Sequence, residues 1–179
     1  MSIKPYVLLD RDGTLIPNIP YLSNHRQVSV TNEVISGLRI IKSLGFNFGI
    51  ISNQSGVGRG LISARQLMEV NSRLVEILSH SGIFIDFFLC CVHQPSLGCN
   101  CRKPKIGLLQ TSKYDKSIDK SYSYMIGDSV ADIEFALLYG VTPILISNKH
   151  EVGGLYKGLL NANNFIEAAY IIQDLTLKT

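Results

Sequence analysis

The sequence lacks most features that mark disordered, secreted or membrane-spanning chains. It has no biased tract, 15 glycines and 6 prolines, and its 179 residues are 17% charged and 46% hydrophobic. This composition excludes disordered and collagen-like chains. No apolar run reaches membrane-spanning length, and the N-terminal MSIKPYVLLDRDGT lacks a basic segment followed by an apolar run. We therefore expect one cytoplasmic domain over residues 1–179, with no membrane partner.

Charge of one sign is not concentrated anywhere in the chain. Seventeen Lys and Arg against fourteen Asp and Glu give a net charge of +3, and the basic residues are scattered. A nucleic-acid interface would gather them in a stripe, so we expect no nucleic-acid partner, and the charge is compatible with a small anionic substrate. The four cysteines all lie between Cys90 and Cys101, too clustered to staple a fold of this size, which favours a metal site over disulfides.

Apolar segments rich in valine, isoleucine and phenylalanine alternate with segments of helical periodicity. This alternation predicts a three-layer, Rossmann-like α/β fold, in which a doubly wound parallel sheet is covered by helices on both faces. The expected strands are 6–9, 47–51, 84–91, 122–126 and 142–146, and the expected helices are 33–44, 63–81, 107–113, 129–139 and 166–175. Ligands bind such sheets beyond the carboxyl ends of the strands, near the point where the strand order reverses.

Three polar clusters lie where expected strands end. Asp10 and Asp12 follow the first strand, Ser52–Gln54 follow the second, and Asp128 and Asp132 follow the fourth. Because parallel strands end at one edge of the sheet, we expect these side chains to share a crevice there. Asp and Gly after a strand also form ordinary capping turns. The second pair of acids after another strand nevertheless favours a catalytic site.

Four short segments, in order over nearly the whole chain, resemble the motifs of a known family. They are LLDRDGTL at 8–15, ISNQ at 51–54, RKP at 102–104 and GDSVAD at 127–132. Together they resemble the four motifs of the haloacid dehalogenase-like (HAD) phosphohydrolases. A dehalogenase would lack the second acid of the first motif, so Asp12 indicates phosphoryl transfer.

The resemblance implies a role for each of these motif residues. Asp10 would attack phosphorus and form an aspartyl phosphate, and Asp12 would protonate the leaving oxygen and later deprotonate water. Asp10, Asp128 and the backbone carbonyl of Asp12 would hold a catalytic Mg²⁺, which prefers oxygen ligands. Ser52 and Lys103 would donate hydrogen bonds to the phosphoryl oxygens.

Three cysteines and one histidine stand at short spacings directly before the RKP segment. Cys91, His93, Cys99 and Cys101 make a complete tetrahedral zinc set with no open position, which predicts a structural zinc. Cys90 and Cys91 would face opposite sides of a strand, so only one can bind, and the spacing selects Cys91. The alternative is four unrelated thiols beside a surface histidine.

The zinc-bearing loop, about residues 90–105 and ending in CRKP, is similar to that of the heptose bisphosphate phosphatases and of the related histidinol-phosphate phosphatases. Both groups are capless, and the intervals after the first two motifs are too short for a cap domain. The segments NQSGVGRG at 53–60 and PYL at 20–22 look more like the heptose enzymes. The resemblance therefore implies removal of the C7 phosphate of D-glycero-D-manno-heptose 1,7-bisphosphate, with histidinol phosphate as the alternative substrate.

The resemblance also implies which residues contact the phosphorylated sugar. Arg102 would hold the second phosphate with its forked guanidinium. Ser129 departs from the Lys or Arg that several family members carry after the GD pair. The alternative from another class is a non-catalytic, zinc-stabilised binding module. Such a module would have lost one of the motif acids, and none is lost here. We therefore expect an enzyme, and we expect it to be a monomer. The full set of expected contacts is Asn18, Ile19, Pro20, Tyr21, Ser52, Asn53, Gln54, Ser55, Arg102 and Lys103.

Overall fold

The computed structural model describes residues 2–147, 156 and 158–178, and a six-stranded sheet forms its centre. All paired strands are parallel, in the order β3-β2-β1-β4-β5-β6. The strands are β1 (Tyr6–Leu9), β2 (Asn47–Asn53), β3 (Phe87–Cys91), β4 (Tyr124–Gly127), β5 (Thr142–Ile146) and β6 (Leu160–Ala162). The helices are α1 (Asn32–Ser43), α2 (Ser55–Gly58), α3 (Ala64–His80), α4 (Gly107–Gln110), α5 (Val130–Tyr139) and α6 (Phe165–Thr176), with 3-10 helices η1 (His25–Gln27), η2 (Pro95–Leu97), η3 (Asp115–Ser117) and η4 (Lys120–Tyr122).

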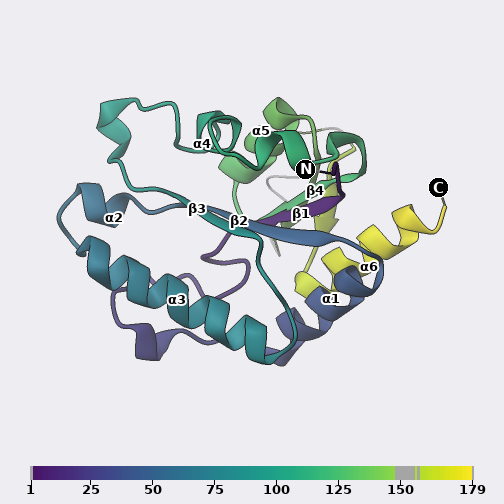
Figure 1. Ribbon diagram of the computed structural model, residues 1–179, viewed down its shortest axis with the longest axis horizontal. Helices are drawn as coiled ribbons and strands as arrows, with labels where there is room; N and C mark the ends of the chain where they lie inside the picture. Colours follow the sequence, from purple (N-terminus) through teal and green to yellow (C-terminus); the bar gives the residue numbers. More distant parts are fainter. Residues whose placement is uncertain (1, 148–155, 157, 179) are drawn as a thin grey trace.

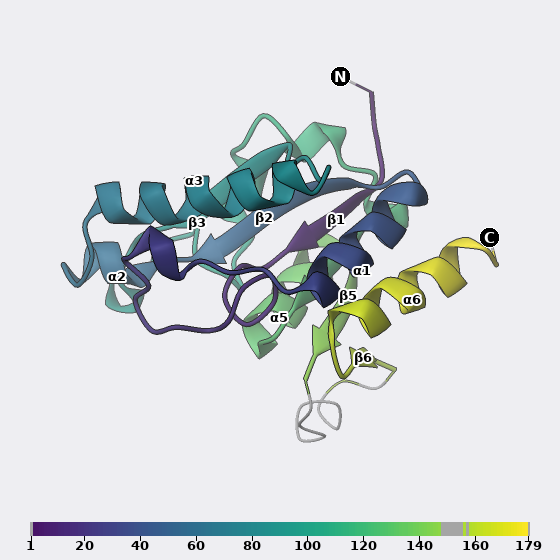
Figure 2. The ribbon, with the colours of Figure 1, turned by 90° about the horizontal axis from the view of Figure 1, so that it is seen from below.

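Helices cover both faces of the sheet (Figure 1), with α1, α3 and α6 on one face and α4 and α5 on the other. Helices α1 and α6 lie side by side, as Figure 2 shows. Side chains of β1 pack into the cores on both faces of the sheet. Val7 and Leu9 pack on the face covered by α1, α3 and α6, Tyr6 and Leu8 pack on the face covered by α4 and α5, and none of the four is more than 4% exposed. A strand buried on both faces is apolar throughout. The predicted three-layer, doubly wound α/β fold is therefore confirmed.

The structure differs from the predicted elements in several places. Helix α2 was not predicted, β2 continues to Asn53 where residue 51 was the expected end, and β4 begins at Tyr124 where residue 122 was the expected start. Strand β6 was not predicted, because an edge strand of three residues is too short to show a periodicity. Strand β3 begins at Phe87 and not at Phe84, which is 67% exposed and lies outside the sheet. Helix α4 ends at Gln110, three residues before the expected end.

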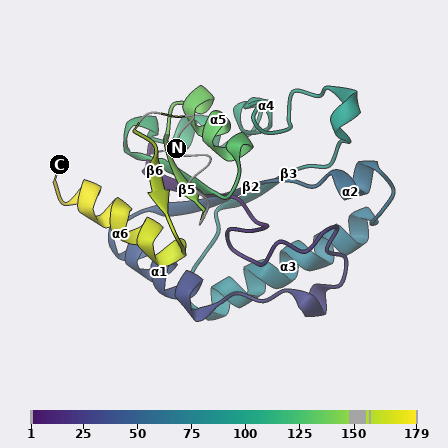
Figure 3. The same cartoon turned by 180° about the vertical axis from the view of Figure 1, so that it is seen from behind.

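The strand order reverses between β1 and β4, which are neighbours at the centre of the sheet. The chain that leaves β1 runs along α3 before α1 begins (Figure 3), and η1 contacts α3. Within the described ranges, the chain between β1 and β3 forms only η1, the helices α1, α2 and α3, and the sheet strand β2, so the prediction of a capless fold is confirmed. None of the described helices combines the length and apolarity that crossing a membrane requires.

Candidate active site

A cavity of about 240 Å³ lies beyond the carboxyl ends of β1, β2 and β4, where the strand order reverses. It brings together every residue expected to act in catalysis or to bind magnesium, and every expected substrate contact except Arg102. The lining residues are Asp10, Arg11, Asp12, Asn18, Ile19, Pro20, Tyr21, Ser52, Asn53, Gln54, Ser55, Gly56, Lys103, Asp128, Ser129 and Asp132.

Three carboxyl groups converge in this cavity. Asp10, Asp128 and Asp132 each offer an oxygen, and these oxygens lie within 4.8 Å of one another. Burial raises the pKa of Asp128 to about 6 and holds the pKa of Asp10 well above its usual range. Gathering acids at such a site carries a free-energy cost that a bound cation removes. Oxygen donors of this kind fit Mg²⁺.

The Lys103 ammonium partly balances these acids. Its Nζ lies 2.6 Å from Oδ1 of Asp10, 2.6 Å from Oδ1 of Asp132 and 2.6 Å from the carbonyl oxygen of Ile51. The side chain is 3% exposed. Burial opposes the charged form, but the charges of Asp10 and Asp132 raise the pKa of Lys103 above its usual value. The site therefore contains a fixed positive charge against Asp10.

Asn53, the last residue of β2, fixes the backbone of Lys103. Its Nδ2 donates to the Lys103 carbonyl oxygen at 3.1 Å, and its Oδ1 accepts from the Lys103 N–H at 3.0 Å. Next along the chain, the Gln54 N–H donates to the carbonyl oxygen of Cys91 at 2.7 Å. These bonds tie the loop that carries Lys103 to the end of β2.

The Asp12 carboxylate turns away from the three convergent acids and toward the second motif. Its Oδ2 accepts from Nε2 of Gln54 at 2.7 Å, and the same Nε2 lies 2.8 Å from the Ser52 hydroxyl oxygen. The loop after β1 passes very close to Asp128, which follows β4. Gly13 in this loop has a φ of +80°, and a Cβ there would collide with the Asp128 carboxylate. A glycine at this position is what lets the loop approach Asp128.

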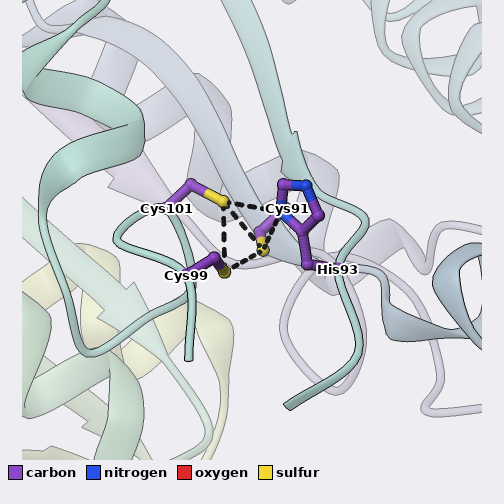
Figure 4. A group of neighbouring side chains, drawn as sticks. All are labelled: Cys91, His93, Cys99 and Cys101. Carbon is purple, nitrogen blue, oxygen red and sulfur yellow. Dashed lines mark hydrogen bonds between the residues drawn. The ribbon is translucent and has the colours of Figure 1, made fainter. Parts of the chain in front are cut away.

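The predicted zinc ligands also come together (Figure 4). The Sγ atoms are separated by 3.2 Å for Cys91 and Cys101, 3.3 Å for Cys99 and Cys101, and 3.6 Å for Cys91 and Cys99, and His93 Nδ1 lies 3.0 Å from Cys101 Sγ. A tetrahedral zinc with bonds of about 2.3 Å separates its sulfurs by about 3.8 Å. The donor set therefore fits zinc, and the three sulfurs lie somewhat closer together than they would around the ion. Cys90 lies apart from this group, where its Sγ accepts from Asn71 Nδ2 at 3.4 Å.

Comparison with known proteins identifies the family. The family model described as polynucleotide kinase 3 phosphatase matches residues 7–157. The chain belongs to this phosphatase family. The D-glycero-beta-D-manno-heptose-1,7-bisphosphate 7-phosphatase of Yersinia pestis is 31% identical over 150 residues, which cover 79% of this chain and 80% of that protein.

Two further comparisons are informative about this member of the polynucleotide kinase 3 phosphatase family. The histidine biosynthesis bifunctional protein HisB of Legionella pneumophila (strain Lens) is 34% identical over 151 residues, 83% of this chain, but the chain spans only 43% of that protein. The crystal structure of D,D-heptose 1,7-bisphosphate phosphatase from B. bronchiseptica, complexed with magnesium and phosphate, superposes with a TM-score of 0.83 at 22% identity, covering 98% of this chain and 99% of that one. This second likeness supports the HAD fold.

Four residues line the cavity although no role was predicted for them: Arg11, Gly56, Ser129 and Asp132, of which Asp132 had been expected at the crevice. The GDSVAD segment contained a signal for Asp132, because an acid in the first turn of a helix that follows Asp128 faces the same crevice. Asp132 Oδ2 accepts from the Ser129 N–H at 3.1 Å and from its hydroxyl at 2.5 Å, which orients the acid toward Lys103. The sequence carried no comparable signal for Arg11.

Arg102 lies outside the described lining of the cavity, although Lys103 beside it is part of that lining. Its Nη1 is buried and has no hydrogen-bond partner among the described residues. The expected contact between Arg102 and a substrate phosphate therefore stays a prediction.

Proposed function

We propose that the chain is a magnesium-dependent phosphomonoester hydrolase that forms an aspartyl phosphate on Asp10. The observation that carries this proposal is the Lys103–Asp10 pair at the point of strand reversal, with Asp128 and Asp132 beside it. Asp10, Asp128 and the Asp12 carbonyl would hold Mg²⁺, which would neutralise the acids and the charge of the phosphoryl group. The chain's own residues perform the remaining steps.

In the first step, an oxygen of Asp10 bonds to phosphorus while the bond to the leaving oxygen breaks and Asp12 gives that oxygen a proton. In the second step, Asp12 takes a proton from water, the water oxygen bonds to phosphorus, and Asp10 is released. Lys103 and the buried Ser52 hydroxyl would donate to the phosphoryl oxygens. Zinc at Cys91, His93, Cys99 and Cys101 would be structural, because four protein ligands leave no open position.

The proposed substrate is D-glycero-D-manno-heptose 1,7-bisphosphate, with loss of the C7 phosphate during the synthesis of nucleotide-activated heptose for surface glycans. The similarity to the Yersinia pestis enzyme over 80% of its length supports this choice. The bifunctional relative supports histidinol phosphate as the second candidate. The proposal is for a single-domain, monomeric, cytoplasmic enzyme whose partner is a small phosphorylated sugar, with neither nucleic acid nor membrane as a partner.

Phosphate release from four kinds of ester tests this assignment. The set contains both anomers of the heptose bisphosphate, histidinol phosphate, a simple phosphosugar and, because of the description of the matching family model, an oligonucleotide with a 3′-phosphate. We expect the highest kcat/KM for one heptose anomer in the presence of Mg²⁺. Faster turnover of histidinol phosphate would promote the second candidate, and faster turnover of the oligonucleotide would overturn both.

Arg102→Ala tests the remote contact proposed for the second phosphate. Loss of a charged hydrogen bond worth about 1.5–3 kcal/mol raises KM for the bisphosphate by about 10- to 100-fold. The KM for a monophosphate should change little, because that substrate has no second phosphate to lose. Equal effects on the two substrates would count against both the contact and the heptose assignment.

A further inference from the structure

Arg11, the residue between the two acids of the first motif, is a buried charge whose role the phosphatase chemistry above does not assign. Its side chain is 1% exposed. The Nε donates to Asp12 Oδ2 at 3.0 Å, and Nη2 donates to Asp12 Oδ1 at 3.0 Å and to Gln54 Oε1 at 2.9 Å. The remaining nitrogen, Nη1, donates to Asn71 Oδ1 at 2.7 Å. The guanidinium therefore has partners in three separate parts of the chain, namely the loop after β1, the residue between β2 and α2, and helix α3, and it binds both carboxylate oxygens of Asp12.

Burying an arginine is costly unless its hydrogen bonds are satisfied and its charge is paired. Here the pairing involves both oxygens of Asp12, and Gln54 adds a second donor on Oδ2. Asp12 consequently has its orientation fixed from two sides. An ordinary surface ion pair would leave a flexible aspartate and an exposed arginine.

We propose that Arg11 is a positioning residue for the proton transfers of Asp12, an inference that rests on the proposed function. The guanidinium fork binds a carboxylate, which is the form that Asp12 takes once its proton has moved to the leaving oxygen. The interaction strengthens as that proton is transferred and the phosphorus–oxygen bond breaks. It therefore stabilises the transition state of the first step more than the bound substrate.

This role has a specific kinetic consequence. An alkyl phosphate must receive a proton on its leaving oxygen, because an alkoxide is a poor leaving group. p-Nitrophenyl phosphate releases a stable phenolate and depends much less on that proton. Loss of Arg11 should therefore lower kcat/KM for the alkyl ester more than for the aryl ester. The quantity kcat/KM is suitable because it reports the steps up to departure of the leaving group.

Asn71 allows the geometry of Arg11 to be disturbed without altering an acid. It lies on α3, outside the described lining of the cavity, and its Oδ1 receives the Nη1 bond of Arg11. Its Nδ2 donates to the Cys90 thiol. Removing the Asn71 amide leaves Asp12 and Gln54 in place but frees one end of the guanidinium.

The experiment measures kcat/KM for an alkyl phosphate and for p-nitrophenyl phosphate, both with Mg²⁺. The proteins compared are the unsubstituted protein and the variants Arg11→Lys, Arg11→Met and Asn71→Ala. Arg73→Met is the matched control, because Arg73 is an exposed arginine on α3 that pairs with Glu76 at 2.8 Å. We expect the alkyl-to-aryl ratio to fall by about tenfold in Arg11→Lys, which keeps the charge but loses the fork, and further in Arg11→Met. Asn71→Ala should lower the ratio by a smaller factor, and Arg73→Met should leave it unchanged.

Equal losses on the two esters in the Arg11 variants would show a purely structural role and overturn the proposal. Thermal unfolding of each variant shows whether it has folded. If both Arg11 variants fail to fold, Asn71→Ala decides: a lowered ratio supports the proposal and an unchanged ratio overturns it. If the unsubstituted protein hydrolyses neither ester, the proposed function itself fails, and this result is seen before any substitution is made.

Discussion

Replacing Lys103 with methionine tests whether its ammonium allows the acids of the crevice to be ionised together. The Nζ lies 2.6 Å from both Asp10 and Asp132, and the side chain is almost completely buried. Methionine has a similar length and no charge, so the substitution changes electrostatics more than packing. Removing one member of a buried ion pair costs about 3–5 kcal/mol of unfolding free energy. With two acids losing their partner, we expect a loss of about 4 kcal/mol at pH 8 in magnesium-free buffer.

The loss should depend on pH with a defined sign. The Lys103 charge lowers the pKa of Asp10 against the larger effect of burial, so the variant has a still higher pKa at Asp10. An acid whose pKa is higher in the folded than in the unfolded state binds more protons when folded. Its folded form is therefore penalised as the pH rises from about 4 through the raised pKa. The destabilisation should accordingly be largest at pH 8 and smaller at pH 5.

Urea unfolding followed by far-ultraviolet circular dichroism at pH 5 and pH 8 measures both quantities. Lys116→Met, at an exposed position, is the matched control and should unfold like the unsubstituted protein at both pH values. A Lys103→Met loss below about 1 kcal/mol at pH 8 would refute the reasoning, because that is the range of surface ion pairs. A loss equal at both pH values would refute the electrostatic explanation.

Three further predictions concern the acids and the metals. Asp10→Asn should abolish Mg²⁺-dependent phosphate release while leaving the circular dichroism spectrum unchanged, since an amide is a poor nucleophile; normal turnover would rule out the mechanism. Cys99→Ser should lower the melting temperature and the zinc content measured by atomic absorption, because binding energy at a structural zinc is folding energy; an unchanged melting temperature with no zinc in either protein would contradict this. Mg²⁺ should raise the melting temperature more at pH 8 than at pH 5, because burial raises the pKa of both Asp10 and Asp128 and protons compete with the ion at low pH. An equal rise at both pH values would argue against binding at these carboxylates.

The sequence was sufficient for the features that depend on local pattern. Asp10 and Asp128 could be placed at one crevice because each directly follows an apolar strand, and parallel strands end at the same edge. The cysteine and histidine spacing likewise predicted four groups that the structure brings within 4.8 Å. These predictions required only the direction of the chain and the chemistry of the side chains.

The remaining features depend on contacts between distant parts of the chain. Lys103 pairs with Asp132 only because the loop after β3 folds back over the end of β2, where Asn53 holds it. Arg11 follows a strand and, as a charged residue, would be expected at the surface. The structure buries Arg11, and Asn71, 60 residues away on α3, accepts a hydrogen bond from its Nη1.

Asp10 is proposed to carry the phosphoryl group during turnover, and this covalent intermediate can be trapped. The most direct measurement is a rapid quench of the Asp12→Asn variant during turnover of p-nitrophenyl phosphate, because this ester needs little proton transfer to form the intermediate, while the water step is slowed without Asp12. Borohydride reduction then converts an aspartyl phosphate to homoserine, which mass spectrometry locates. We expect homoserine at position 10. Phosphate release by a protein whose Asp10 is never modified, or modification at Asp128 instead, would contradict the account.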